Sequence, residues 1–145
     1  AVTGVLISPP QGEAFRNSVD PLPFSLTLRG VAVTSVDTDA IDIEGMLGVV
    51  TFEDVTASGA PFDGIDIRTR NHVILTRVRA LQNGNDGVQI RFEAAGDLTV
   101  AHSAANGNRG FGDGDDGFEI DMYDGSVTLT DTTANDNGAD GIDID

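Results

Sequence analysis

The sequence contains no cysteine and no lysine, and it has no long hydrophobic run. Without cysteine, the chain can form no disulfide framework and offers no thiol for catalysis or metal binding. No stretch is apolar enough to span a bilayer, and no basic-then-apolar leader is present. We therefore expect no membrane insertion.

Positive charge is also scarce. The chain has 24 acidic and 8 basic residues, which gives a net charge of −16 at pH 7. All the basic residues are arginine, at positions 16, 29, 68, 70, 77, 79, 91 and 109. Such a chain is unsuited to nucleic acid and anionic lipid, because both need cationic contacts. It is compatible with calcium and with cationic or neutral glycans.

The sequence is rich in one feature, a repeat. An apolar-x-apolar unit behind a small turn residue occurs at 4–7, 40–43, 64–67, 87–90, 117–120 and 141–144. The step is 24 residues from Ile41 to Ile65, 23 from Ile65 to Val88, and 24 from Phe118 to Ile142. Self-similarity at this period indicates a solenoid or a propeller.

Within each repeat the apolar residues alternate with period two between Gly, Asn and Asp, which predicts short strands. Such strands need partners from the next repeat, and coils stacked about 4.8 Å apart supply them in parallel. We therefore predict an all-β parallel β-helix of about five coils with ~24 residues each. It would be a single domain over 1–145, with loop insertions at 8–23 and 106–116. Two inward columns are expected, one of Val5, Ile41, Ile65, Val88, Phe118 and Ile142, the other of Ile7, Ile43, Ile67, Ile90, Ile120 and Ile144.

The segments LQNGNDGVQI (81–90) and ANDNGADGIDI (134–144) resemble the right-handed parallel β-helix repeat of the pectin-lyase-like superfamily. The resemblance covers Val5 to the end and implies a right-handed coil. It leaves the function open, because the superfamily contains lyases, epimerases, hydrolases, phage tailspikes, adhesins and inert surface proteins. An acidic, cysteine-free β-solenoid is typical of the bacterial cell exterior. We therefore expect an extracellular or cell-surface location.

An aspartate precedes the turn residue in five units, at Asp39, Asp63, Asp86, Asp116 and Asp140. Stacked at strand spacing, these carboxylates would repel by about a kcal/mol or more per neighbour unless something compensates. In one explanation, each side chain accepts a hydrogen bond from the backbone N–H two residues further on, as in an Asx turn. In the other, calcium bridges the column.

Further charged residues project outward from the strand that follows each of these aspartates. The candidate binding residues are Asp42, Asp66, Arg68, Arg91, Glu119 and Asp121. The superfamily resemblance implies that such a face can line a polysaccharide groove. The alternative is a solvated face on which the two arginines pair with acids of neighbouring coils, at about 0.2–1 kcal/mol per pair.

The insertion at 106–116 is rich in Gly and Asp, and it offers Asp113, Asp115 and Asp116 as candidate metal ligands. Several carboxylates on a flexible backbone suit the irregular oxygen shell of calcium. The loop matches neither the EF-hand pattern nor the Gly-rich calcium-binding nonapeptide. Calcium is the one cofactor that the sequence suggests.

Catalytic motifs are sparse, and no catalytic residue is assigned. The segments 37–39 and 115–116 resemble a polygalacturonase, but its Gly-His-Gly and Arg-Ile-Lys motifs are missing. Without lysine, a lyase or epimerase would have to use arginine, His72, His102 or Tyr123 as acid or base. The repeat register brings no two of the last three together. It aligns His102 with a charge-alternating column of Asp54, Arg77 and Asp131.

The sequence therefore favours a non-enzymatic, extracellular, structural or adhesive module. Its ladder begins and stops at the same phase, so copies could stack head to tail into a filament or continue a longer solenoid. The interface would comprise Val5 and Ile7 at one end and Ile142 and Ile144 at the other. The alternatives are a fragment of a polysaccharide lyase, epimerase or hydrolase, and a calcium-dependent glycan-binding module. The expected partners are other copies of the chain and, in the alternatives, polysaccharide.

Overall fold

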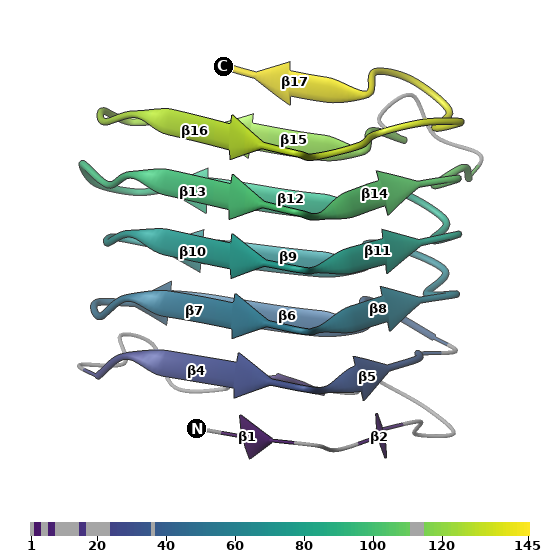
Figure 1. The fold of residues 1–145 in the computed structure, drawn as a ribbon, viewed down its shortest axis with the longest axis horizontal. Helices are drawn as coiled ribbons and strands as arrows, with labels where there is room; N and C mark the ends of the chain where they lie inside the picture. Colours follow the sequence, from purple (N-terminus) through teal and green to yellow (C-terminus); the bar gives the residue numbers. More distant parts are fainter. Residues whose placement is uncertain (1, 4–5, 8–14, 17–23, 36, 111–114) are drawn as a thin grey trace.

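The computed structural model describes residues 2–3, 6–7, 15–16, 24–35, 37–110 and 115–145. Its strands form three parallel sheets, here called A, B and C, and the described ranges contain no helix. Each complete coil gives one strand to each sheet in turn, and successive coils stack as layers (Figure 1). The predicted all-β parallel β-helix of about five coils is confirmed.

The three sheets share the same order of coils. Sheet A consists of β1 (Val2–Thr3), β4 (Leu26–Arg29), β7 (Val50–Glu53), β10 (Val73–Thr76), β13 (Leu98–Ala101) and β16 (Val127–Thr130). Sheet B consists of β2 (Leu6–Ile7), β5 (Ala32–Val33), β8 (Thr56–Ser58), β11 (Arg79–Leu81) and β14 (Ala104–Asn106). Sheet C consists of β3 (Phe15–Arg16), β6 (Ile41–Met46), β9 (Ile65–Thr69), β12 (Val88–Phe92), β15 (Phe118–Asp121) and β17 (Ile142–Ile144).

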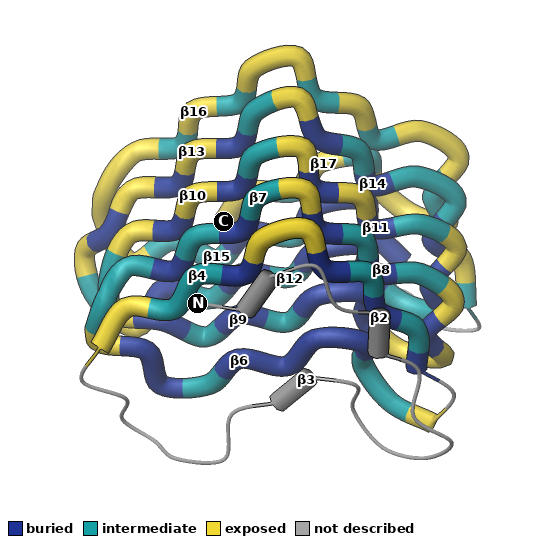
Figure 2. The backbone as a smooth tube through the Cα atoms, turned by 60° about the horizontal axis from the view of Figure 1, so that its bottom comes forward, coloured by how far each residue is buried: buried dark blue, intermediate teal, exposed yellow. Residues whose placement is uncertain are grey.

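The core is a set of apolar columns that run through the coils. In sheet C, Ile41 pairs with Ile65, Ile65 with Val88, and Val88 with Phe118. These four side chains are fully buried, as are most inward residues of sheets A and B. Figure 2 shows the buried segments alternating with partly exposed ones along the middle coils. Alternation in the sequence thus becomes a division between core and surface.

The first coil differs from the prediction. Leu6 and Ile7 lie in sheet B and pair with β5, so Ile7 is not in the sheet C column of Ile43. The sheet C strand of this coil is β3, which lies inside the predicted insertion at 8–23 and pairs with Ile41 and Asp42. Val5 lies outside the described residues. The error arose because one apolar-x-apolar unit suits any of the three sheets, and only the spacing identifies its sheet.

The bend between sheets A and B depends on one left-handed residue in each of five successive coils. Gly30, Asp54, Arg77, His102 and Asp131 occupy this position, with φ between 48° and 61°. Four of the five are not glycine, although a side chain makes this conformation costly. Because a left-handed residue turns the chain sharply, the side chains here project outward at the corner of the coil.

An asparagine ladder occupies the turn between sheets B and C. The backbone N–H groups of Ala60, Asn83 and Asn108 each donate to the side-chain oxygen of the asparagine one coil later, and the distances are all 3.1 Å. These acceptors are Asn83, Asn108 and Asn137. Asn83 and Asn108 are buried, so the ladder satisfies backbone groups that water cannot reach.

The asparagine ladder also explains the small turn residue of the repeat. A Cβ on Gly64 would lie 2.4 Å from Nδ2 of Asn83, and one on Gly87 would lie 2.6 Å from Nδ2 of Asn108. Both distances are shorter than real contacts allow, so these positions require glycine. In the earlier coil the residue is Ala40, and there the ladder position one coil later is Ala60 rather than asparagine.

The second predicted insertion, at 106–116, leaves the coils in register. Val88 pairs with Phe118 although 30 residues separate them. Asn108 keeps its place in the asparagine ladder, and Asp116 is followed directly by Gly117 and the next sheet C strand. The additional residues therefore leave and rejoin the coil on the side of the turn between sheets B and C. Residues 111–114 lie outside the described ranges.

The core columns give the first prediction. Replacing Ile65 by alanine should lower the free energy of unfolding by about 2–5 kcal/mol, and replacing Phe118 by about 3–5 kcal/mol, because each change opens a cavity between two coils. The control is Ile74→Ala, since Ile74 lies on β10 with its side chain partly exposed. It should cost less than about 1 kcal/mol. Urea denaturation would measure all three, and equal losses would contradict the assignment of the core.

Candidate functional site

The aspartate column forms a ladder from coil to coil. The backbone N–H of each later aspartate donates to Oδ1 of the aspartate one coil earlier. The N···O distances are 2.8 Å for Asp63 to Asp39, 3.0 Å for Asp86 to Asp63, 2.7 Å for Asp116 to Asp86, and 2.6 Å for Asp140 to Asp116. The predicted Asx turn is therefore wrong, because the donor is the N–H of the aspartate one coil later and not the N–H two residues further along the chain. In a parallel stack, the N–H of the next coil faces the carboxylate directly.

Burial changes the protonation of this ladder. It raises the pKa of Asp63 to about 6, although a hydrogen bond from Asn85 opposes the rise. Burial also raises the pKa of Asp86, which is 1% exposed, and a hydrogen bond with Glu119 raises it further. The pKa of Asp116 is raised by burial as well. Protonation removes part of the repulsion that five stacked carboxylates would otherwise produce.

The six predicted binding residues all lie on strands of sheet C, where the sequence places them. Asp42 pairs with Asp66 in the register of β6 and β9, and Arg68 pairs with Arg91 in that of β9 and β12. Glu119 and Asp121 lie on β15, opposite Gln89 and Arg91. The register therefore brings the six residues into two adjacent columns.

Contacts between coils connect the two columns. Nη2 of Arg91 lies 2.5 Å from Oδ2 of Asp66, and the amide of Gln89 donates to Glu119. Nε of Arg68 lies 3.9 Å from Glu93, at the edge of ion-pair distance. The predicted pairing between coils is thus present for Arg91. It is weak for Arg68, whose directly opposed neighbour Arg91 has the same charge.

The face is also partly dehydrated. Asp42 is buried, and burial raises the pKa of Asp66 to about 6 despite the nearby Arg91 guanidinium. The pKa of Asp121 is raised by burial and by Glu119. Within the described chain, Oδ1 of Asp66 and Nε of Arg91 are buried and make no hydrogen bond. With a pKa of about 6, Asp66 can exchange a proton near neutral pH. A polar ligand would reach the two buried atoms only if the surrounding side chains moved.

The candidate metal ligands are only partly placed. Asp113 lies outside the described residues. Asp115 is buried, and its Oδ1 has no hydrogen-bond partner in the described ranges, whereas Asp116 uses Oδ1 to accept the N–H of Asp140. No group of three or more His, Cys, Asp or Glu among the described residues is arranged to hold a metal ion. A calcium site here stays a prediction.

The possible acids and bases lie on separate corners. Nδ1 of His72, between β9 and β10, accepts the backbone N–H of Asp97 at 2.9 Å, while Nδ1 of His102, between β13 and β14, lies 3.3 Å from the carboxylate of Asp131. Tyr123 is exposed in the turn between β15 and β16. The two histidines thus interact with acids of the following coil, as the alignment of His102 predicted.

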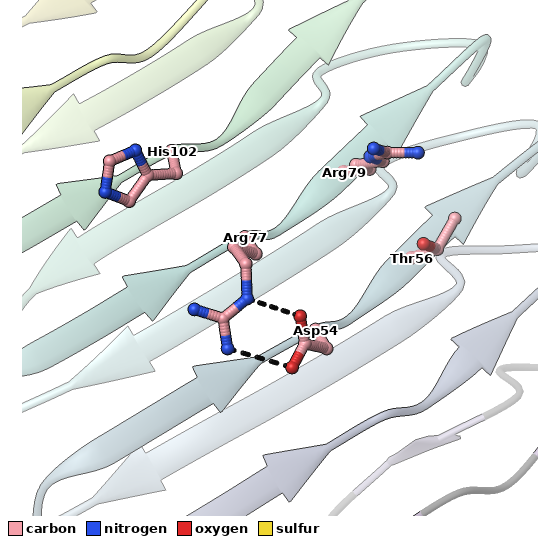
Figure 3. Close-up of a pocket in the computed structure, with 5 residues that line it drawn as sticks. All are labelled: Asp54, Thr56, Arg77, Arg79 and His102. Carbon is pink, nitrogen blue, oxygen red and sulfur yellow. Dashed lines mark hydrogen bonds and ion pairs between the residues drawn. The ribbon is translucent and has the colours of Figure 1, made fainter.

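One feature escaped the sequence interpretation. A hollow of about 400 Å³ lies at the bend between sheets A and B, lined by Asp54, Thr56, Arg77, Arg79 and His102 (Figure 3). The sequence alignment grouped three of these residues but gave no sign of a concavity. The sequence feature that could have indicated it is the spacing of Arg77 and Arg79. They lie on either side of a left-handed bend, so both side chains project from the same corner of the coil.

These observations define a parallel β-solenoid whose apolar columns and polar ladders extend through successive coils. A family model described as the right handed beta helix region matches residues 21–145, and the chain belongs to this family. The right-handed β-helix inferred from the pectin-lyase-like resemblance is thereby confirmed. Comparisons with curated proteins and with solved structures found no match. The described ranges include no helix with the length and apolar character to cross a membrane.

The raised pKa values give the second prediction. Because Asp63 and Asp66 hold their protons more tightly in the folded chain, their stabilising contribution is complete below about pH 4 and is lost as pH rises through about 6. The melting temperature should therefore be higher at pH 5 than at pH 8. Asp63→Asn mimics the protonated acid and keeps an acceptor for the ladder. It should raise the free energy of unfolding at pH 8 by about 1–3 kcal/mol.

The control for this prediction is Asp54→Asn. Asp54 is exposed, and its hydrogen bond with Arg77 holds its pKa below the usual value. This variant should therefore gain no stability at pH 8 and should leave the slope between pH 5 and 8 unchanged. Calorimetric scans at several pH values would decide. A wild-type melting temperature that rises steadily from pH 5 to 8 would contradict the buried, protonated ladder.

Proposed function

We propose that the chain is a non-enzymatic structural or adhesive module, located outside the cell, whose coils continue onto those of further copies or onto further coils of a longer solenoid. The observation that carries this proposal is the exposure of β17. Ile142 is 40% exposed and Ile144 is 47% exposed, whereas the residues of their columns in β6, β9, β12 and β15 are at most 1% exposed. Two side chains in core register therefore lie open to solvent.

The backbone supports the same proposal. β17 is the last strand of sheet C and β16 the last of sheet A, so each presents one unpaired edge within the described chain. The inward residues of β16, Val127 and Leu129, are only partly buried. An open parallel edge with apolar side chains beneath it is a template for a further strand.

At the opposite end, the outermost strands of sheets A, B and C are β1, β2 and β3. Corrected for the register of the first coil, the strand that would continue β17 is β3, and not the segment of Val5 and Ile7. Two different surfaces would then meet, and such a heterologous contact generates a filament when it does not close into a ring. Composition supports the extracellular location, since the chain is acidic and has no cysteine.

The third prediction tests this assembly. The double variant Ile142→Glu with Ile144→Glu places charge on the open core, whereas Thr128→Glu with Thr130→Glu adds the same charge to exposed positions of β16. Wild type and control should form assemblies that grow with concentration, and the isoleucine variant should need at least about tenfold more protein, because each buried charge is costly. Sedimentation velocity and electron microscopy would measure this.

Circular dichroism would show that both variants remain folded, as expected for positions already open to solvent. A wild type that stays monomeric at all concentrations would contradict stacking between copies. In that case, a native mass larger than this chain would assign the open edge to further coils of the same polypeptide. Equal assembly of the two double variants would also overturn the proposed interface.

A calcium-dependent glycan-binding module is the second candidate. The observation that favours it is Asp115, a buried carboxylate whose Oδ1 has no hydrogen-bond partner in the described ranges. A bound cation would compensate such an oxygen. The ligand face in this alternative would be the outward side of sheet C, with Asp66, Arg91 and Glu119 facing the polysaccharide.

The fourth prediction separates the two candidates. For the structural module, the melting temperature should not respond to calcium chloride or to a chelator. For the calcium-dependent module, 100 Kd of calcium should add about 2.7 kcal/mol of stability, and magnesium should substitute poorly. Asp115→Asn should abolish that gain, while Asp131→Asn, at an exposed carboxylate, should retain it. A calcium gain unaffected by Asp115→Asn would exclude this site.

A further inference from the structure

The hollow at the bend between sheets A and B has a simple structural origin. Thr56, Arg79 and Ala104 are directly paired in sheet B on three successive coils, and the side chains of Thr56 and Ala104 are short. The left-handed residues Asp54 and Arg77 stand beside them at the corner. A long side chain between two short neighbours leaves a concavity, and Figure 3 shows Arg79 and His102 on either side of Arg77.

Arg79 differs from the other arginines. From residue 24 onward, six arginine side chains lie within 4.0 Å of a carboxylate, namely those of Arg29, Arg68, Arg70, Arg77, Arg91 and Arg109. Within the described ranges, Arg79 forms no ion pair and no side-chain hydrogen bond, and its ladder neighbours are uncharged. In a chain with 24 acids, this is an uncompensated cation in a concave site.

The acids near the hollow are already neutralised. Nε and Nη2 of Arg77 donate to the two carboxylate oxygens of Asp54 at 2.5 and 2.9 Å, and Nη2 also lies 2.7 Å from Glu53. This pairing holds the pKa of Asp54 below its usual value, so the carboxylate stays an acceptor for Arg77. Glu53 also pairs with Arg29 at 2.6 Å. Neither acid is therefore free to pair with Arg79.

Several donors remain available around Arg79. The Thr56 hydroxyl lines the hollow and makes no hydrogen bond in the described chain. The Arg77 nitrogen not bonded to Asp54 points away from it, on the side where His102 lies (Figure 3). Nδ1 of His102 lies 3.3 Å from Asp131, and His102 borders the hollow without being counted as a donor to it. Thr56 and Arg77 thus offer donors beside Arg79 from two successive coils.

We propose that this hollow binds a small oxyanion, a sulfate, phosphate or carboxylate group, and that Arg79 holds it with two parallel N–H donors. A guanidinium presents five donors in a planar fork that matches such groups. The Thr56 hydroxyl donates a further hydrogen bond from the preceding coil. The site is separate from sheet C and does not depend on the stacking of copies.

The net charge of the chain does not prevent such binding. Charges more than about 8 Å apart are largely screened at physiological ionic strength, so the anion responds mainly to the residues of the hollow. Among the residues that line the hollow, the charge of Asp54 is offset by Arg77, and Arg79 is left in excess. Affinity should consequently improve as salt rises from very low concentration, because the repulsion from distant acids is removed first.

The fifth prediction tests the site with inorganic sulfate. Wild-type protein titrated with sodium sulfate at constant ionic strength should show saturable shifts of the Arg79 Nε–H signal in NMR spectra. Arg79→Gln should weaken binding by about tenfold or more, because a charge-assisted pair of hydrogen bonds is lost. Thr56→Val should weaken it several-fold. The matched control is Arg109→Gln, which removes the same charge from an exposed arginine outside the hollow.

The outcomes distinguish the site from general ion effects. Binding followed by calorimetry that is equal in Arg79→Gln and Arg109→Gln would overturn the proposal, as would the absence of saturation with sulfate, phosphate and acetate. Comparing inorganic sulfate with a sulfated disaccharide identifies the source of the group. Tighter binding of the disaccharide indicates a glycan substituent, and equal binding indicates the free ion. Arg79 is exposed and unpaired, so its replacement should leave the melting temperature unchanged.

Discussion

Hydrogen bonding between equivalent residues of successive coils is the constraint on which this molecule depends. No described strand pairs with another strand of its own coil, so each sheet forms only when one coil lies on the next. The same geometry extends to the turns, where Asn108 accepts the backbone N–H of Asn83 and Asp86 accepts that of Asp116. Because each repeat satisfies its neighbour, stability is a property of the stack and not of any coil alone.

Stacking equivalent residues is favourable for apolar and amide side chains, but it is costly for charges. The chain reduces this cost in two ways. On the corner between sheets A and B, charge alternates from Asp54 to Arg77, and on sheet C Arg91 reaches the acid of the preceding coil. In the aspartate ladder, burial raises the pKa so that protonation replaces pairing. Uptake of a proton by these buried carboxyl groups removes a charge that stacking opposes, so the stability of the ladder depends on pH.

The sequence predicted the sheets because a period of two, repeated every 23 or 24 residues, admits few structures other than stacked parallel strands. It placed Ile65 and Phe118 in the core correctly. It failed for Ile7, since a short apolar unit does not reveal which sheet it joins until its spacing to the next coil is used. The aspartate donors were missed for a related reason: the Asx-turn explanation considered contacts along the chain, while the N–H group comes from the next coil. Arg79 could not be singled out, because lack of a partner is a property of the assembled surface.

The asparagine ladder shows how one local requirement links several positions of the repeat. The amide nitrogen of Asn83 occupies the space that a Cβ at Gly64 would need, so an asparagine in one coil requires glycine in the preceding one. Ala60 occupies the ladder position without an asparagine, and the residue of the preceding coil that corresponds to Gly64 is there Ala40. The Asn and Gly of the repeat are therefore a coupled pair, separated by a coil in the chain but in contact in space. A coil that carries the pair can continue the ladder in either direction, and this makes the stack extendable in a way that a closed globule is not.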